Sequence, residues 1–270
     1  MVNAYMELYG KKVLHHNFGD DLNYFMLREL TGRQIVNYKD LYIREVIHYC
    51  CIGSILNSLA NKYSIVWGAG FISETMGLLE KPLKICAVRG KLTRQRLISL
   101  GIECPPVYGD PALLLPLVYT PIGFTPKRSC FHIGIIPHVD ELNEPIINRL
   151  VMQYKDTFVI KFNKYKDWHD VINKICQCDF IISSSLHGII ISDAYNIPNI
   201  WAEFSDNIRW QYFKFRDYYS AVRETIPDPI KITFNTSLEE LMEYKEEWRP
   251  IEIDLKKLLL ACPFKLNLKI

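Results

Sequence analysis

One pattern recurs along this 270-residue chain and constrains its fold most strongly. A short apolar run rich in β-branched residues is followed by Gly or a polar cluster and then by a helical stretch. The runs are KKVLHH, VIHYCC, SIVW and KICAV in the first half, and FHIGII, TFVIKF, DFIIS and NIWAEF in the second. Because these runs lack strict alternation, they indicate strands covered on both faces, as in parallel sheets. Alternation of such strands with helices predicts a doubly wound α/β fold.

The chain contains enough residues for two such domains. Four prolines, at positions 111, 116, 121 and 126, interrupt residues 111–128 and indicate a linker there. We therefore predict a boundary near Lys127, with a Rossmann-like lobe in residues 1–127 and another in 128–270. The C-terminal segment LKKLLLACPF is predicted to be helical and could cross back to the first lobe.

Composition narrows the classes of protein. Hydrophobic residues make up 49% of the chain and the formal net charge is +2, which fits a globular protein and argues against a nucleic-acid partner. The N-terminus lacks a signal-peptide core, and the apolar runs are too short to cross a bilayer. The scattered cysteines lack zinc-site spacing, since Cys176 and Cys178 have no second pair nearby. We expect a cytoplasmic protein without a metal site.

Ligands of parallel α/β sheets bind outside the carboxyl ends of the strands. The residues that directly follow the predicted strands are therefore the candidates, and we expect them to line a central cleft between the lobes. These positions are Asn17–Asp21, Gly53-Ser54, Gly68–Gly70, Arg89, His138–Asp140, Lys161 and Ser183–His187.

The most informative of these positions is Ser183-Ser184-Ser185-Leu186-His187-Gly188, between a buried strand and the helical stretch IIISDAYN. Backbone N–H groups at a helix N-terminus bind anions, and serine hydroxyls extend such a site. The helix dipole should lower the pKa of His187 and a bound polyanion should raise it again. His187 is thus predicted to transfer a proton beside a bound anion. An N-capping Ser with a structural His is the alternative interpretation.

Several collinear motifs resemble the polysaccharide pyruvyltransferase family. They are Gly19-Asp20-Asp21-Leu22-Asn23, Trp67-Gly68-Ala69-Gly70, Arg89 to Arg94, Gly109 to Leu114, and Ser183 to Gly188. Gly134 to His138 and a late stretch, Phe213 to Tyr218, fit the same pattern. Each motif is weak alone, but their order covers nearly the whole chain.

This resemblance implies two Rossmann-like lobes arranged as in GT-B glycosyltransferases. It also implies transfer of pyruvate from phosphoenolpyruvate to two hydroxyls of one sugar, forming a cyclic ketal in a bacterial capsule or exopolysaccharide. The donor is a substrate, and the scheme requires no cofactor. His187 is our candidate general acid. The expected donor-binding residues are Arg89, Ser184, Ser185, Leu186, His138, Lys161 and Lys214, of which Arg89 is the preferred anion clamp.

Ser185 departs from the family pattern, because many relatives carry Arg at this position. The phosphate anchor must then be weaker or come from elsewhere, and Lys161 and Lys214 are the candidates.

On the acceptor side, we expect Asp20, Asn23 and Gly70 to bind the saccharide. A carboxylate could deprotonate an acceptor hydroxyl, and glycine allows close approach of a ligand. The basic and apolar stretch from Leu255 could touch the inner face of the membrane if the acceptor is lipid-linked; a closing helix with solvated lysines is the alternative.

Two other functions stay open on the sequence. One is a nucleotide-sugar-dependent GT-B glycosyltransferase. The other is a non-catalytic saccharide-binding relative, an idea that Ser185 supports and that the intact His187 and Arg89 oppose. A Ser-His-Asp hydrolase is disfavoured because the chain has no G-x-S-x-G motif.

Overall fold

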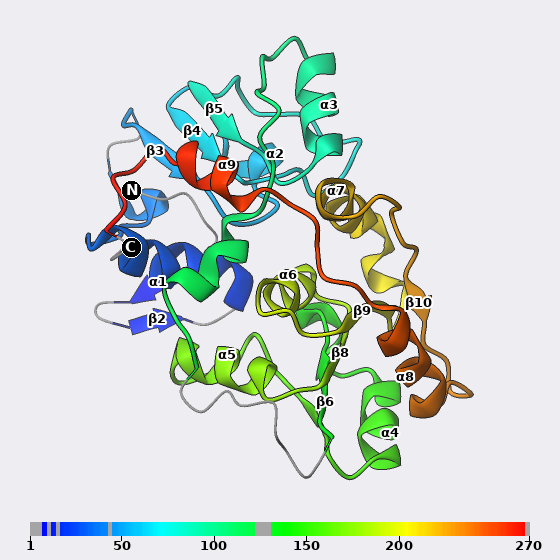
Figure 1. The fold of residues 1–270 in the computed structure, drawn as a ribbon. Helices are drawn as coiled ribbons and strands as arrows, with labels where there is room; N and C mark the ends of the chain where they lie inside the picture. Colours follow the sequence, from blue (N-terminus) through cyan, green and yellow to red (C-terminus); the bar gives the residue numbers. More distant parts are fainter. Residues whose placement is uncertain (1–6, 10–11, 15–16, 43–44, 122–130, 268–270) are drawn as a thin grey trace. The chain divides into compact units, whose positions relative to one another are not determined.

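The computed structural model describes residues 7–9, 12–14, 17–42, 45–121 and 131–267 of the chain (Figure 1). The chain divides into two compact units. The first comprises Met1–Val118, Trp210–Ile226 and Glu252–Ile270, and the second comprises Tyr119–Arg209 and Pro227–Ile251. The chain therefore returns to the first unit twice. The boundary predicted at Lys127 lies outside the described residues.

The first unit is built on a parallel three-stranded sheet. Its strands, in the order β3-β4-β5, are β3 (His48–Cys50), β4 (Ser64–Trp67) and β5 (Lys84–Ala87). Apolar residues from all three strands are buried, among them Cys50, Val66 and Ile85. This is the two-sided burial expected for non-alternating apolar runs.

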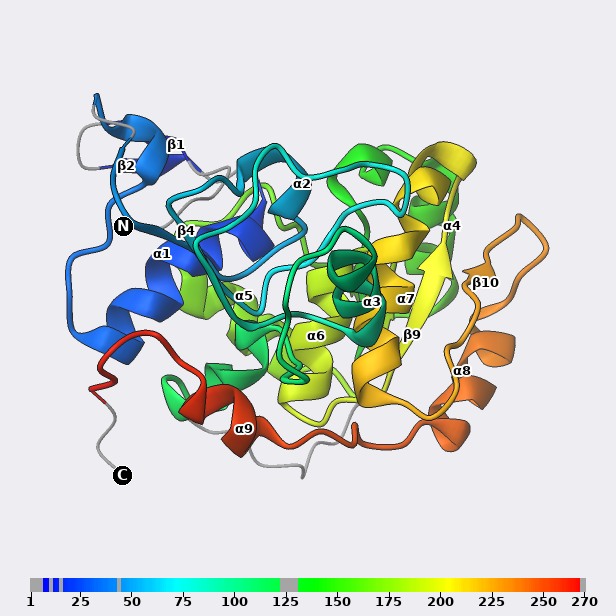
Figure 2. The same ribbon diagram turned by 90° about the horizontal axis from the view of Figure 1, so that it is seen from above.

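Helices and short 3-10 helices surround this sheet. They are α1 (Phe18–Thr31), η1 (Tyr38–Asp40), α2 (Leu56–Leu59), α3 (Lys91–Ser99), η2 (Pro111–Leu117), α7 (Tyr212–Val222) and α9 (Leu255–Leu260). Helix α1 begins where Asn17 accepts a hydrogen bond from Gly19 N at 3.2 Å, and it ends at the left-handed Gly32. Figure 2 shows α7 alongside α3, although more than a hundred residues separate them.

The first apolar run does not join this parallel sheet. Strand β2 (Lys12–Leu14) pairs with β1 (Glu7–Tyr9) in a separate antiparallel sheet. Only the short register from Glu7 opposite Leu14 to Tyr9 opposite Lys12 is formed. The expectation that every apolar run enters a parallel sheet is therefore wrong for this run.

The proline-rich segment also differs from the linker that we predicted. Its first part is the 3-10 helix η2, in which Pro111 to Leu115 are buried. Asp110 caps this helix by accepting from Ala112 N at 3.0 Å, and Pro111 stands at the first position, where proline is tolerated. The apolar residues that follow Pro111 make this segment part of the core.

The last helix packs within the first unit. Helix α9 contacts η2, and the carbonyl of its buried Leu258 accepts a hydrogen bond from Trp67 Nε1 at 2.9 Å. Its lysines, Lys256 and Lys257, are exposed.

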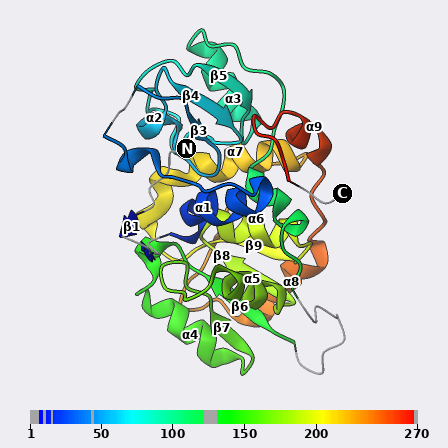
Figure 3. The same ribbon diagram turned by 90° about the vertical axis from the view of Figure 1, so that its left-hand side faces the viewer.

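The second unit contains a parallel five-stranded sheet in the order β10-β9-β8-β6-β7 (Figure 3). The strands are β6 (Ile133–Ile136), β7 (Thr157–Val159), β8 (Phe180–Ser183), β9 (Asn199–Glu203) and β10 (Ile230–Lys231). Its helices are η3 (Val139–Glu141), α4 (Pro145–Gln153), α5 (Trp168–Cys176), α6 (Leu186–Ala194), η4 (Asp206–Gln211) and α8 (Leu238–Glu247), with η4 ending in the first unit. In Figure 1, α5 and α6 lie on one side of this sheet and α4 and α8 on the other.

These observations confirm an α/β protein with parallel sheets, consistent with Rossmann-like units. The GT-B-like arrangement implied by the resemblance stays a prediction. No helix in the described part of the chain has the length and apolar character needed to span a membrane.

Candidate functional site

Arg89 lies two residues after the end of β5 and is completely buried in the first unit. Its guanidinium donates three hydrogen bonds within the protein: Nε to Asp217 Oδ2 at 3.0 Å, one terminal nitrogen to Ser54 Oγ at 2.5 Å, and the other to the Phe71 carbonyl at 2.6 Å. A buried guanidinium requires such partners, since the cost of its desolvation is otherwise large. The geometry therefore gives Arg89 an internal structural role, and its contact with a donor stays a prediction.

Asp217, on α7, also accepts hydrogen bonds from the start of α3. Its Oδ1 accepts from Thr93 N at 2.7 Å, and its Oδ2 accepts from the Thr93 hydroxyl at 2.7 Å. Glycines make room for this packing. A Cβ at Gly70 would lie 2.6 Å from Arg89 Cζ, and one at Gly90 would lie 1.7 Å from the Asp217 carbonyl oxygen. The packing of the Arg89–Asp217 ion pair thus explains why position 70 has no side chain. The predicted contact of Gly70 with the acceptor stays a prediction.

Asn23 joins α1 to the loop after β3. Its Nδ2 donates to the carbonyls of Asp20 at 3.0 Å and Ile52 at 2.9 Å, and its Oδ1 accepts from Ile52 N at 3.0 Å. The side chain is fully buried. Asn23 therefore fixes the Ile52 loop against the first turn of α1, and its predicted role in acceptor binding stays a prediction.

Two carboxyl groups beside this loop have strongly raised pKa values. Burial and the neighbouring Asp21 raise the pKa of Asp20 to about 7, while Lys214 and Lys39 oppose the shift. Burial also raises the pKa of Asp110 to about 7. Asp20 is half-buried, whereas Asp110 is fully buried. Asp20 is thus a carboxyl that titrates near neutrality and retains access to solvent, as a general base requires.

The predicted cations occupy different units. Lys214 is a buried residue of α7 in the first unit, where its Nζ donates to Gln211 Oε1 and lies 5.4 Å from the centre of the Phe215 ring. Lys161 follows β7 in the second unit and is exposed. Arg89 and Lys214 thus belong to one unit, and the other predicted donor-binding residues belong to the second.

The serine loop connects β8 to α6 at the carboxyl end of the second sheet. Ser183 Oγ accepts from Ser185 N at 3.1 Å and donates to the Ile136 carbonyl at 3.0 Å. Ser184 Oγ accepts from His138 N at 2.9 Å. The loop is therefore tied to the end of β6, and Ser185 stands at the N-cap of α6 without a side-chain cap hydrogen bond.

His187 lies in the first turn of α6, immediately behind this loop. The residue is only 7% exposed, and Leu186 is buried as well. The structure thus places His187 and the three serines together at one helix N-terminus, as we predicted from their spacing. The roles of these residues in catalysis and donor binding stay predictions.

His138 and an unpredicted carboxylate lie beside the serine loop. His138 Nδ1 accepts from Asp140 N at 3.3 Å. Glu141 is fully buried and accepts from Ser205 Oγ at 2.8 Å. Burial raises the pKa of Glu141, while hydrogen bonds from Ser184 and Ser205 lower it. Glu141 is the residue after His138–Asp140, the segment predicted as a candidate after β6. Its partner Ser205 lies far along the chain.

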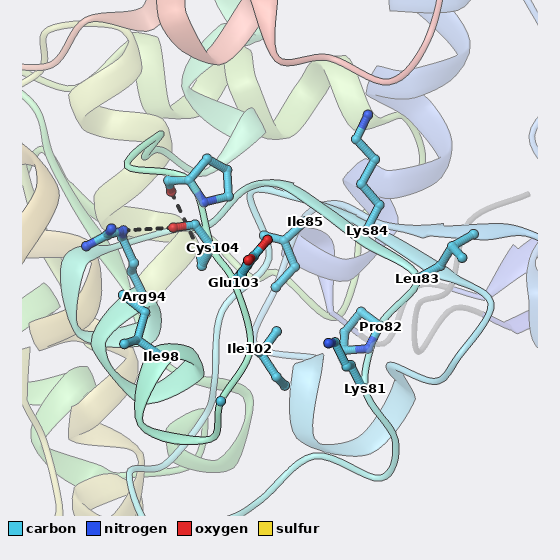
Figure 4. A pocket seen from close by; sticks show the side chains of 12 residues that line it. Lys81, Pro82, Leu83, Lys84, Ile85, Arg94, Ile98, Ile102, Glu103 and Cys104 are labelled. Atoms are coloured by element: carbon cyan, nitrogen blue, oxygen red, sulfur yellow. Dashed lines mark hydrogen bonds between the residues drawn. The ribbon is translucent and has the colours of Figure 1, made fainter.

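A surface pocket of about 810 Å³ opens elsewhere on the first unit (Figure 4). It lies at the start of β5 and the turn after α3, with Leu83, Ile85 and Ile102 among its apolar residues. Arg94 Nε donates to the Cys104 carbonyl at 3.0 Å on its rim. Because ligands of such sheets bind at the carboxyl ends of strands, this pocket at the amino end of β5 is not our candidate site.

Comparison with known proteins identifies the family. The family model described as polysaccharide pyruvyl transferase matches residues 17–205, which is most of the chain. This chain belongs to the polysaccharide pyruvyl transferase family. The matched residues begin just before Asp20 and extend past His187. The first turn of α1 and the serine loop therefore both lie within the match.

Two relatives are similar to this chain over most of its length. This chain is 26% identical over 255 residues to the succinoglycan biosynthesis protein ExoV of Rhizobium meliloti, covering 90% of this chain and 73% of that protein. It is 28% identical over 230 residues to the uncharacterized protein L143 of Acanthamoeba polyphaga mimivirus, covering 80% and 76% of the two chains. No solved structure matches this family member significantly.

Proposed function

We propose that this protein transfers pyruvate from phosphoenolpyruvate to two hydroxyls of one sugar and so forms a cyclic ketal. Membership in the polysaccharide pyruvyl transferase family supports this function. The similarity to a succinoglycan biosynthesis protein supports a saccharide of a bacterial exopolysaccharide or capsule as the acceptor. The observation that carries the proposal is the position of His187 in the first turn of α6, directly behind three serines.

The reaction balances with protein side chains as the only catalysts. A proton is added to the methylene carbon of the enol, which leaves a cationic centre at the carbon that bears phosphate. One sugar hydroxyl bonds to this carbon, the bond to the phosphate oxygen breaks, and the second hydroxyl closes the ring. Two protons leave the hydroxyls: one replaces the proton given to the methylene group, and the other is carried by phosphate or solvent.

His187 is the proposed general acid for the first of these steps. The end of α6 that carries it has the backbone dipole of a helix N-terminus, which favours an anion, and Ser185 makes no side-chain cap hydrogen bond there. An enol phosphate bound there would place its negative charge beside the imidazole and favour the protonated ring. Ser184, Ser185 and Leu186 would then contribute to donor binding.

The donor carries a carboxylate and a phosphate and needs cations. His138 and Lys161 are the proposed partners in the second unit. His138 follows β6, which pairs with β8, and Lys161 follows β7, the strand that precedes β8 in the chain. Lys214 and Arg89 are the proposed cations of the first unit. Both side chains are held by hydrogen bonds inside that unit. They would therefore attract the donor electrostatically from fixed positions more than by moving to contact it.

Asp20 is the proposed base for an acceptor hydroxyl. Its pKa of about 7, raised by burial, matches the value that makes a carboxylate an effective base near neutral pH. Asn23 would hold the first turn of α1, which carries Asp20, in place. Gly70 would leave room for the Arg89–Asp217 ion pair.

We also propose that the reaction takes place in the cytoplasm, where phosphoenolpyruvate would be available. An acceptor linked to a membrane lipid would bring the protein to the inner face of the membrane. The exposed Lys256 and Lys257 of α9 are suited to such a contact.

Thermal unfolding tests donor binding directly. Phosphoenolpyruvate at about one hundred times its Kd should stabilise the fold by about 2.7 kcal/mol, a shift of several degrees in Tm, whereas nucleotide sugars should give none. Lys161→Met should reduce the shift, and Lys164→Met, an exposed lysine of the same loop, should preserve it. Stabilisation by a nucleotide sugar and not by phosphoenolpyruvate would favour a glycosyltransferase and contradict the proposal.

A further inference from the structure

The pocket in Figure 4 takes no part in the proposed reaction, and it is built within the first unit. Its volume of about 810 Å³ lies within the range of about 300–1,000 Å³ that is usual for ligand sites. The segment that leads into β5, one side of α3 and the turn after α3 form its walls. Its apolar lining comes from Pro82, Leu83, Ile85, Ile98, Ile102 and Pro105.

Three cations, Lys81, Lys84 and Arg94, share this lining with one carboxylate, Glu103. In the view of Figure 4, Arg94 lies on one side of the pocket and Lys81 on the other, with apolar side chains between them. Arg94 is fixed by a hydrogen bond from its Nε to the Cys104 carbonyl at 3.0 Å. Among the residues that the structure describes, none of the three cations forms an ion pair. The pocket therefore offers uncompensated positive charge to a ligand.

The rim of the pocket exposes large apolar side chains to solvent. Leu83 is 55% exposed and Ile98 is 47% exposed, although both belong to the lining. Leu79 and Leu100, which lie within two residues of the lining along the chain, are exposed as well. A group of exposed apolar side chains beside a pocket indicates a surface that contacts another molecule.

The mixture of lysines and exposed leucines favours a membrane surface over a protein partner. The cores of protein interfaces are depleted of charged residues, whereas Lys81 and Lys84 both lie within two residues of Leu83. At an anionic bilayer, apolar side chains enter the acyl boundary while the ends of lysine side chains reach the lipid phosphates. The net positive charge of the lining complements such head groups.

We propose that this pocket and its rim bind the surface of an anionic phospholipid membrane. Lys81, Lys84 and Arg94 bind lipid phosphates, and Leu83 and Ile98 insert among the acyl chains. The inference goes beyond the proposed pyruvyl transfer, because it concerns a second surface that binds without turnover. It places the main membrane contact at β5 and α3 and not at α9.

Co-sedimentation with lipid vesicles tests this proposal. The wild-type protein should bind vesicles of phosphatidylcholine and phosphatidylglycerol in equal parts, bind phosphatidylcholine alone more weakly, and lose affinity as salt is added. One lysine near an anionic surface contributes about fivefold to binding, so the double variant Lys81→Gln/Lys84→Gln should bind about 25-fold more weakly. Leu83→Ser should also weaken binding, because it removes an apolar side chain that enters the bilayer.

Each variant has a matched control in the second unit. The double variant Lys164→Gln/Lys166→Gln removes the same net charge from two exposed lysines, and Met152→Ser removes one exposed apolar side chain. Both control proteins should bind the vesicles as the wild type does. Thermal unfolding of all variants shows that the compared proteins are folded.

Wild-type affinity of the folded pocket variants for the anionic vesicles would overturn the proposal. Loss of binding by Lys256→Gln/Lys257→Gln would then place the contact on α9. Failure of the wild-type protein to bind would overturn the proposal as well, and self-association that Leu83→Ser abolishes would in that case assign the rim to a second copy of the chain. These measurements use no phosphoenolpyruvate, so their outcome is separate from that of the proposed function.

Discussion

Replacement of His187 with Ala should lower kcat for the proposed pyruvyl transfer by about 100- to 10,000-fold, the usual contribution of a general acid. The methylene carbon of an enol is a weak base, so its protonation requires an acid held in place beside it. His187 stands in the first turn of α6, largely shielded from water and directly behind the Ser183–Ser185 loop. Water cannot readily substitute for the imidazole at such a position.

The loss should appear in kcat more than in donor affinity, because proton transfer takes place in the transition state. Phosphoenolpyruvate should therefore still raise the Tm of the His187→Ala protein. His169→Asn is a suitable control, since His169 lies at the start of α5 in the same unit, is partly exposed, and makes its side-chain hydrogen bond to Asp167. Full turnover by His187→Ala would exclude the proposed proton transfer.

The Asp217→Ala protein should lose about 3–5 kcal/mol of its free energy of unfolding, the cost of leaving a buried charge without its partner. Arg89 is fully buried, and its other acceptors, Ser54 Oγ and the Phe71 carbonyl, are neutral. The substitution also removes the acceptor for Thr93 N and the Thr93 hydroxyl. Both effects act on the folded state, since water solvates the same groups in the unfolded chain.

Urea denaturation measures this loss. Glu224→Ala is the matched control, because Glu224 lies just after α7 in the same unit and is exposed, and its removal should change stability by less than about 0.5 kcal/mol. A loss below about 1 kcal/mol for Asp217→Ala would mean that the Arg89–Asp217 pair is not an essential contact of the first unit.

Much of the architecture could be predicted from local sequence. Seven of the eight apolar runs form the parallel strands β3 to β9, because each is short, rich in β-branched residues and followed by a turn or a helix start. The exception, residues 12–14, pairs with residues 7–9, and such pairing depends on a partner that periodicity does not specify. The proline-rich segment contains the first break between the two units, between Val118 and Tyr119, but its first part differs from the predicted linker for a related reason: Pro111 begins a buried 3-10 helix, and burial depends on what surrounds it.

The candidate site was harder to predict because its contacts join distant parts of the chain. Arg89 was expected to clamp a ligand on the basis of its place after a strand, but its acceptor Asp217 lies 128 residues away. Asp217 occurs within the stretch Phe213 to Tyr218, in which the sequence singled out Lys214 and gave Asp217 no role. Glu141 and Ser205 are similarly far apart. By contrast, the association of His187 with Ser183–Ser185 is local, and its spacing sufficed to predict it.

The proposed function is tested most directly by following the carbon atoms of the donor. The protein would be incubated with phosphoenolpyruvate labelled with ¹³C at its methylene carbon and with a panel of oligosaccharides that offer adjacent or alternate hydroxyl pairs. We predict phosphate release that needs both substrates, and a ¹³C signal of a methyl group whose neighbouring carbon is bonded to two oxygens of one sugar. Transfer of a sugar from a nucleotide sugar to the same oligosaccharides, with the labelled donor unchanged, would contradict it.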